Sequence, residues 1–141
     1  MKIAIGSDHG GFALKVVILP LLQDLGHEVQ DLGCYDTASV DYPAFADAVC
    51  EKVSSKNADC GILICGTGIG MSMAANKKEG IRAALCSDHY TACMSREHND
   101  ANVLCLGERV TGPGVAEEIV KVWLATSFGG GRHLRRIELF S

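Results

Sequence analysis

The stretch Cys60-Gly61-Ile62-Leu63-Ile64-Cys65-Gly66-Thr67-Gly68-Ile69-Gly70 decides the fold class of this chain. Residues 60–65 form a short, continuously apolar run, which is typical of a strand buried on both faces of a parallel sheet. Residues 66–70 carry alternate glycines, and a helical pattern begins at Ile69. The stretch therefore predicts a buried strand, a tight turn and the start of a helix.

The same alternation of a short run and a helical segment occurs along the whole chain. The predicted strands are Lys2–Gly6, Glu28–Leu32, Cys60–Cys65, Arg82–Cys86 and Val103–Gly107. The predicted helices are Gly11–Leu25, Tyr42–Ser54, Ile69–Lys78, Asp88–Glu97 and Gly112–Thr126, with a last one over about 131–141. Because we interpret each run as continuously apolar, we expect a single α/β domain over 1–141. Its five-stranded parallel Rossmann-like or flavodoxin-like sheet should be covered on both faces, in three αβα layers.

The first predicted helix has two unusual features. Pro20 lies inside it and removes the hydrogen bond to the carbonyl of Val16, so we expect the helix to kink or end there. The helix is also apolar almost all round between Val16 and Leu22. We therefore expect its outer side to meet another subunit rather than water.

Composition excludes several classes of partner. The 13 Lys and Arg against 17 Asp and Glu give a net charge of -4, which offers no bulk attraction for nucleic acid or an anionic membrane. The seven cysteines include no C-x-x-C and no zinc-site spacing, so we expect reduced thiols and no metal. The chain shows no secretory signal and no run near the roughly 18 apolar residues of a membrane span. These features predict a soluble, cytoplasmic protein.

Ligands of open parallel sheets bind beyond the carboxyl ends of the strands. Three predicted strands end in turns that are rich in glycine or polar residues: Gly6–Gly11, Cys65–Gly70 and Gly107–Arg109. The alternate glycines of 66–70 leave successive N–H groups free to face an anion at a helix N-terminus, so we interpret this turn as a nest for an oxyanion or a phosphate. Its G-x-G-x-G spacing departs from the dinucleotide pattern. Asp88, about 20 residues further on, lies where a dinucleotide-binding site has an acidic residue. This is weak support for a dinucleotide site, because Asp88 more simply caps the next helix.

Cys65 lies directly beside this nest, where helix-terminal N–H groups favour a thiolate that could act as a base or a nucleophile. The alternative is a buried apolar cysteine like Cys60. Asp8 and His9 pair a hydrogen-bond acceptor with a titratable donor at the first strand end. The alternative for Asp8 is a turn-stabilising role.

Two further groups of polar residues lie late in the chain. His98 and Asn99 follow a helix end, where a favourable helix-end charge and a helix stop are the alternatives to a functional role. Arg132 and Arg136 lie four apart on the terminal helix and share one face, so they could grip a phosphate together. A solvated basic tail is the alternative. The three glycines before the helix and the basic cluster in an acidic protein favour the phosphate clamp.

Five parts of the chain form a set: Gly6-Ser7-Asp8-His9-Gly10-Gly11, Asp41-Tyr42-Pro43, Cys65-Gly66-Thr67-Gly68-Ile69-Gly70, Ser95-Arg96-Glu97-His98-Asn99-Asp100-Ala101-Asn102 and the terminal arginines. This set resembles the type B ribose-5-phosphate isomerases over nearly the whole chain. That family also contains galactose-6-phosphate isomerase subunits and enzymes acting on allose 6-phosphate. The resemblance implies a cofactor-free aldose–ketose isomerisation of a sugar phosphate, ribose 5-phosphate to ribulose 5-phosphate, at a dimer interface.

The resemblance also implies a role for each matching residue. Cys65 would be the base that moves a proton between the two carbons of an enediolate, and His98 would open the sugar ring. N–H groups of the turn made of Gly66, Thr67, Gly68, Ile69 and Gly70 would stabilise the oxyanion. Asp8, Thr67 and Asn99 would hold sugar or carbonyl oxygens, Tyr42 would border the ring, and His9, Arg109, Arg132 and Arg136 would take the phosphate.

One branch of the family uses a glutamate at the position of Met71 instead of the cysteine. The cysteine at 65 and the methionine at 71 therefore resemble the cysteine branch.

Topology adds an expectation about the assembly. Cys65 ends a strand, whereas His98 ends a helix that has run back to the opposite edge of the sheet. With about five residues per strand rising roughly 3.3 Å each, the two side chains would be on the order of 15 Å apart. We therefore expect His98 to serve the partner subunit's Cys65 in a homodimer; pairing of dimers into tetramers stays open.

Two alternatives come from other classes. One is a non-catalytic phosphate or nucleotide sensor of the same shape. The other is a metal site built from Asp8, His9 and Cys65. A six-carbon sugar phosphate also stays open as the substrate.

Overall fold

The computed structural model describes all residues 1–141, and its strands and helices alternate along the chain. The elements are β1 (Lys2–Ser7), α1 (Phe12–Asp24), β2 (Glu28–Asp31), α2 (Tyr42–Ser54), β3 (Cys60–Cys65), α3 (Ile69–Ala75), β4 (Ala83–Leu85), α4 (His89–Glu97), β5 (Val103–Gly107), α5 (Pro113–Ala125) and α6 (Arg132–Glu138). All strand pairs are parallel, and the order in the sheet is β2-β1-β3-β5-β4. The predicted parallel αβα fold is confirmed.

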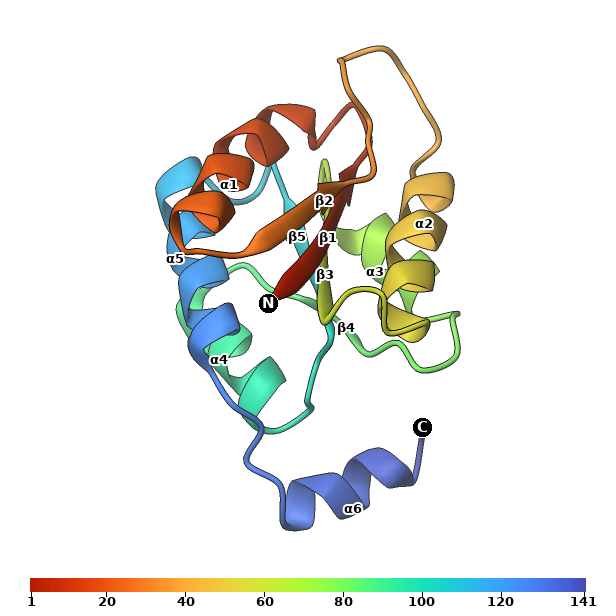
Figure 1. Ribbon diagram of the computed structural model, residues 1–141, viewed down its shortest axis with the longest axis vertical. Helices are drawn as coiled ribbons and strands as arrows, with labels where there is room; N and C mark the ends of the chain where they lie inside the picture. Colours follow the sequence, from red (N-terminus) through yellow and green to blue (C-terminus); the bar gives the residue numbers. More distant parts are fainter.

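The sheet is covered by helices on both faces (Figure 1). On one face α1, α4 and α5 pack a cluster that includes Ile18, Ile62 and Trp123. On the other face α2 and α3 pack a smaller cluster that includes Val49, Leu63 and Cys65. The central strands β1, β3 and β5 are buried from both sides. The predicted site residues that follow their carboxyl ends are therefore attached to a rigid part of the fold.

The two outer strands differ from the expectation of continuously apolar runs. In β2, Glu28 and Gln30 are exposed and alternate with partly buried residues, and β4 is only three residues long. Both strands lie at the edges of the sheet, where one side of the backbone has no neighbour and polar residues are tolerated. Helix α3 likewise ends at Ala75, three residues earlier than predicted.

Of the two predicted effects of Pro20, a kink or an end of the helix, the end is wrong. The helix continues through it to Asp24. Ile18 and Leu22 on either side are fully buried in the core, and burial of side chains of this size stabilises by roughly 1.5–3 kcal/mol each. This offsets the cost of about 3 kcal/mol for a proline inside a helix.

The apolar surface of α1 is mostly covered within the chain. Val17, Leu19 and Leu21 are partly buried against the core of this chain, and Val16 is the one large apolar residue of the helix that is exposed, at 51%. On the outer side of the helix, which we expected to meet another subunit, only a small apolar patch at Val16 is therefore left uncovered.

Helix α6 projects from the body of the molecule at the end opposite the carboxyl ends of the strands (Figure 1). Gly130 and Gly131 precede it with φ of 63° and 58°, values that favour glycine, and they turn the chain away from α5. Ile137 is its buried residue, whereas Leu134, Leu139 and Phe140 are exposed. None of the helices combines the length and the apolar character that crossing a bilayer requires.

Candidate active site

The direction of the strand order reverses between β1 and β3, which lie next to each other in the centre of the sheet. Such a switch point opens a crevice beyond the carboxyl ends of the strands. The turn 7–11 follows β1 and the turn 66–70 follows β3, so both predicted turns border this crevice. The third, Glu108–Arg109, follows β5 beside β3.

Cys65 is the last residue of β3 and is 5% exposed. Its Sγ accepts a hydrogen bond from the N–H of Gly68 at 3.1 Å. A backbone N–H at sulfur is an interaction that strengthens when the acceptor is ionised. The turn therefore places an N–H donor against the sulfur of Cys65, the atom that would carry the negative charge if this residue is the predicted base.

Four of the five other buried cysteines have a raised pKa. Burial raises the pKa of Cys50 and of Cys60 to about 11, and it also raises the pKa of Cys86 and, well above its ordinary value, of Cys105. These four groups are therefore protonated thiols at neutral pH and behave as small apolar side chains.

The glycine turn keeps part of its N–H groups free. Gly68 has a φ of 78° and donates to Cys65, and Ile69 donates to Oγ1 of Thr67 at 3.2 Å. The N–H groups of Gly66, Thr67 and Gly70 have no acceptor within the chain. Two of the five predicted donors are thus engaged locally, and three remain for an oxyanion or a phosphate.

Asp8 and His9 lie at the end of β1. Oδ1 of the buried Asp8 accepts from the N–H groups of Gly10 at 2.9 Å and Gly11 at 3.1 Å, which is the turn-stabilising role. Nδ1 of His9 accepts from the N–H of Val40 at 3.2 Å. The neutral ring therefore carries its proton on Nε2, which is left as a donor for a ligand.

Tyr42 and Arg109 border the same turn. A Cβ built on Gly70 would lie 2.7 Å from Cζ of Tyr42, so the phenol ring lies directly against this glycine. A Cβ built on Gly66 would lie 3.0 Å from Nη1 of Arg109. The backbone N–H of Arg109 donates to the carbonyl of Gly66 at 2.9 Å. A positive charge and an aromatic ring thus flank the free N–H groups.

The remaining predicted site residues lie at the other end of the molecule. His98 caps the C-terminus of α4, and its ring stacks on that of His133 in α6, with centroids 4.2 Å apart and an interplanar angle of 13°. Asn99 follows it, and Arg132 and Arg136 lie on α6. The N–H of Gly129 donates to the carbonyl of Glu97 at 2.9 Å and ties the linker before α6 to the end of α4.

The distance between the two groups follows from the sheet register. The carbonyl of Asn102, just after the His98 turn, accepts from the N–H of Gly61 near the start of β3. From Gly61 to Cys65 the strand rises about 3.3 Å per residue, or roughly 13 Å in total. Within the chain, His98 and Cys65 therefore lie at opposite ends of β3.

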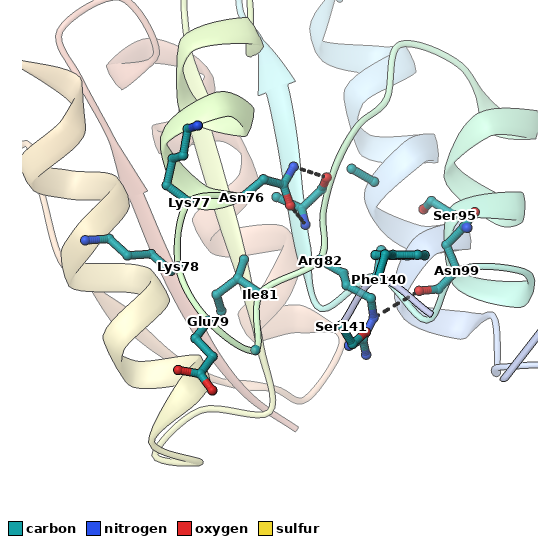
Figure 2. A pocket seen from close by; sticks show the side chains of 14 residues that line it. Asn76, Lys77, Lys78, Glu79, Ile81, Arg82, Ser95, Asn99, Phe140 and Ser141 are labelled. Carbon is teal, nitrogen blue, oxygen red and sulfur yellow. Dashed lines mark hydrogen bonds between the residues drawn. The ribbon is translucent and has the colours of Figure 1, made fainter. Parts of the chain in front are cut away.

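A cavity of about 730 Å³ lies beside the second group, and none of its lining residues belongs to the turn of Cys65. It opens between the loop that follows α3, the start of β4, the end of α4 and the C-terminal residues, and Figure 2 shows Asn99 and Phe140 on its wall.

Asp8, His9 and Cys65 do not form a ligand group. No three His, Cys, Asp or Glu side chains are arranged to hold a metal ion, and the ring nitrogen Nδ1 of His9 is already an acceptor for the N–H of Val40. The alternative of a metal site built from these three residues is therefore not supported by their geometry.

The His98–His133 stack predicts a measurable titration. The pKa of His133 is lowered from its ordinary value of 6.5, first by desolvation and then by the positive charges of His98, Arg132 and Arg136. Because the pKa of His133 is lower in the folded state than in the unfolded state, the stack is favoured at higher pH and weakens as the pH falls below 6.5.

His98→Ala should raise the pKa of His133 towards 6.5 in an NMR titration, because it removes both the covering ring and a charge. Arg135→Gln, on the same helix, should leave it unchanged; an unaltered His133 titration in His98→Ala would contradict the coupling.

His133 illustrates what sequence reasoning missed. It belongs to the basic segment, but its contact with His98 joins residues 35 positions apart, and no local pattern indicates such a pair. The same holds for Glu108, whose Oε1 accepts from the N–H of Leu14 at 2.7 Å and ties α1 to the turn after β5.

The fold and this edge of the sheet define a class: a parallel αβα protein with an anion-binding glycine turn at its topological switch point and a cysteine beside it. A model of the ribose/galactose isomerase family matches residues 3–140. The chain belongs to this family. It is similar to the ribose-5-phosphate isomerase B of Escherichia coli, with 50% identity over 137 residues, 97% of this chain and 92% of that protein.

Two further comparisons agree with this placement. The chain is 45% identical to the galactose-6-phosphate isomerase subunit LacB of Clostridium acetobutylicum over 91% of this chain and 74% of that one. The solved structure of the ribose-5-phosphate isomerase B of Clostridium thermocellum superposes with a TM-score of 0.98, at 56% identity, covering 99% of this chain and 94% of that one.

Proposed function

We propose that the protein interconverts ribose 5-phosphate and ribulose 5-phosphate through an enediolate. The observation that carries this proposal is the sulfur of Cys65 beside three free N–H groups, those of Gly66, Thr67 and Gly70. Proton transfer next to a carbonyl needs a base and donors placed where negative charge develops. The turn after β3 supplies both within a few residues.

The proton path uses one group twice. The thiolate of Cys65 takes the proton from the carbon next to the aldehyde, the carbonyl oxygen becomes the enediolate oxyanion, and the N–H groups of the turn hold that charge. The cysteine then returns the proton to the neighbouring carbon, while the hydroxyl proton moves between the two oxygens. The reaction balances with no external oxidant or reductant, and no cofactor enters it.

The phosphate is held by charge from both ends of the molecule. His9 offers its Nε2 proton and Arg109 its guanidinium at the cysteine turn. Arg132 and Arg136 lie on α6, at the far end of the same subunit. In the proposed homodimer these two arginines come from the partner, together with the His98 that opens the ring and the Asn99 that holds a sugar oxygen.

Exposed apolar side chains near the glycine turn support a dimer. Ile69 and Met73 on α3 are 47% and 66% exposed, and Leu85 on the edge strand β4 is 42% exposed. A Cβ on Gly68 would lie only 2.5 Å from Cδ1 of Leu85, so Leu85 packs directly against the turn. An apolar rim around a polar site is a feature of surfaces that another chain covers.

The assay of choice is the conversion of ribose 5-phosphate to ribulose 5-phosphate, with and without a chelator, alongside galactose 6-phosphate and allose 6-phosphate. We expect ribose 5-phosphate to be turned over at an unchanged rate after chelation. Faster conversion of a six-carbon substrate would transfer the proposal to that sugar, as the similarity to the LacB subunit allows. Tight binding of sugar phosphates without turnover would favour the sensor alternative and overturn the proposal.

A further inference from the structure

The turn that carries His98 and Asn99 is held from outside by Arg82, which precedes β4. Nε of Arg82 donates to the carbonyls of Asn99 and Asp100, both at 3.1 Å, and Nη2 pairs with Oδ2 of Asp100 at 3.1 Å. Figure 2 shows Arg82 reaching towards Asn99 across the wall of the cavity. One guanidinium thus binds two successive carbonyls and a carboxylate of the same turn.

A second arginine contacts the same turn. Arg96, in the last turn of α4, donates through Nη1 to the carbonyl of Ala101 and lies 3.5 Å from Oδ1 of Asp100. Its guanidinium lies 5.0 Å from the ring of Trp123, which is buried in the core. Arg96 therefore links the turn to the rigid interface between α4 and α5.

Asp100 is the residue on which both arginines converge. Its φ of 46° lies in the left-handed region, which few residues other than glycine, asparagine and aspartate adopt readily. The two carboxylate oxygens face one guanidinium each. The unusual backbone angle sharply reverses the chain after Asn99 and before the approach to β5.

We propose that Arg82 and Arg96, acting through Asp100, are positioning residues that fix the turn presenting His98 and Asn99 to the partner's site. This inference rests on the proposed function, in which His98 and Asn99 of this turn act on the sugar in the partner's site. The two arginines contact backbone carbonyls, Asp100 and Trp123, so they act on the turn and not on the sugar. Two guanidinium groups, one from the residue before β4 and one from α4, thus converge on three successive residues of the turn, 99–101.

Two variants test the proposal. Asp100→Asn keeps the side-chain shape and tolerates the left-handed backbone, while it removes the charge that faces both arginines. Arg82→Met removes the guanidinium and keeps most of the side-chain length. Because a displacement of about 1 Å in a catalytic group can cost up to 10²-fold, we expect kcat/KM to fall about tenfold or more in each. Asp47→Asn, which breaks the 2.9 Å surface pair with Lys78, is the matched control and should retain full activity.

A mixed-dimer experiment separates positioning from general damage. Each variant is allowed to exchange subunits with Cys65→Ala and, separately, with His98→Gln. In the first mixture, one site of each mixed dimer joins an intact Cys65 to an intact turn. For a variant with a tenfold loss, random reassortment gives roughly 28% of wild-type activity with Cys65→Ala but only roughly 5% with His98→Gln.

The outcomes distinguish a failure of the positioning role from a failure of the proposed function. Recovery with Cys65→Ala but not with His98→Gln supports positioning of the turn. Equal activity in both mixtures, or unchanged kcat/KM in Asp100→Asn and Arg82→Met, would overturn it. A loss of thermal stability without this asymmetry would show a folding role alone. If Cys65→Ala and His98→Gln fail to complement each other, the shared site of the proposed function itself fails.

Discussion

Replacing Cys65 by alanine should lower kcat by about 10²–10⁴-fold, the contribution typical of a positioned general base. The Kd of the sugar phosphate should stay close to the wild-type value, because the thiolate acts along the reaction path and the N–H groups, His9 and Arg109 remain. Single-turnover kinetics and calorimetric titration with ribose 5-phosphate measure the two quantities separately.

Cys60→Ala is the matched control for this variant. Cys60 and Cys65 occupy the two ends of β3 and are both 5% exposed, so the two alanine substitutions remove equally buried sulfurs from one strand. Only Cys65 receives an N–H at its sulfur, whereas burial raises the pKa of Cys60 to about 11. Cys60→Ala should therefore keep its kcat. If Cys65→Ala keeps most of its kcat as well, the cysteine is structural and the mechanism is wrong.

Activity should return when two inactive variants, Cys65→Ala and His98→Gln, exchange subunits. The turn of His98 lies beside Gly61, and roughly 13 Å of β3 separate Gly61 from Cys65, too far for both side chains of one chain to act on one small sugar. In a mixed dimer, one site is doubly damaged and the other combines an intact cysteine with an intact histidine. Random reassortment of equal amounts restores roughly a quarter of wild-type activity.

The arginines of α6 extend this experiment. The double variant Arg132→Ala/Arg136→Ala should mainly weaken binding, and in mixed dimers it should complement Cys65→Ala but not His98→Gln, because it damages the same half of the site as His98. Mass spectrometry of differently tagged subunits checks that exchange has taken place. Complete exchange without any recovery of activity would place Cys65 and His98 in one chain or in separate reactions.

The central fold was accessible from local patterns. The strand 60–65 and the turn 66–70 lie where the sequence predicted them, and β5 and α2 have the predicted bounds. These segments are buried on both faces or show a clear helical period, so hydrophobic pattern and backbone preference agree. The predictions failed where tertiary position overrides the local signal. Polar residues in β2 are tolerated because the strand lies at an edge, and Pro20 is tolerated because the core holds the helix on both sides of it.

The sequence by itself determined the parallel sheet, the glycine turn and the kinds of residue that gather beyond the carboxyl ends of the strands. Tertiary structure alone decided which of them meet. It places Asp8, His9, Tyr42 and Arg109 around the turn of Cys65, and it places His98, Asn99, Arg132 and Arg136 at the opposite end. It also joins Arg82 and Arg96 to Asp100. Periodicity reports the environment of a residue within its own element, whereas contacts between elements depend on sheet order and helix direction, which local spacing does not encode.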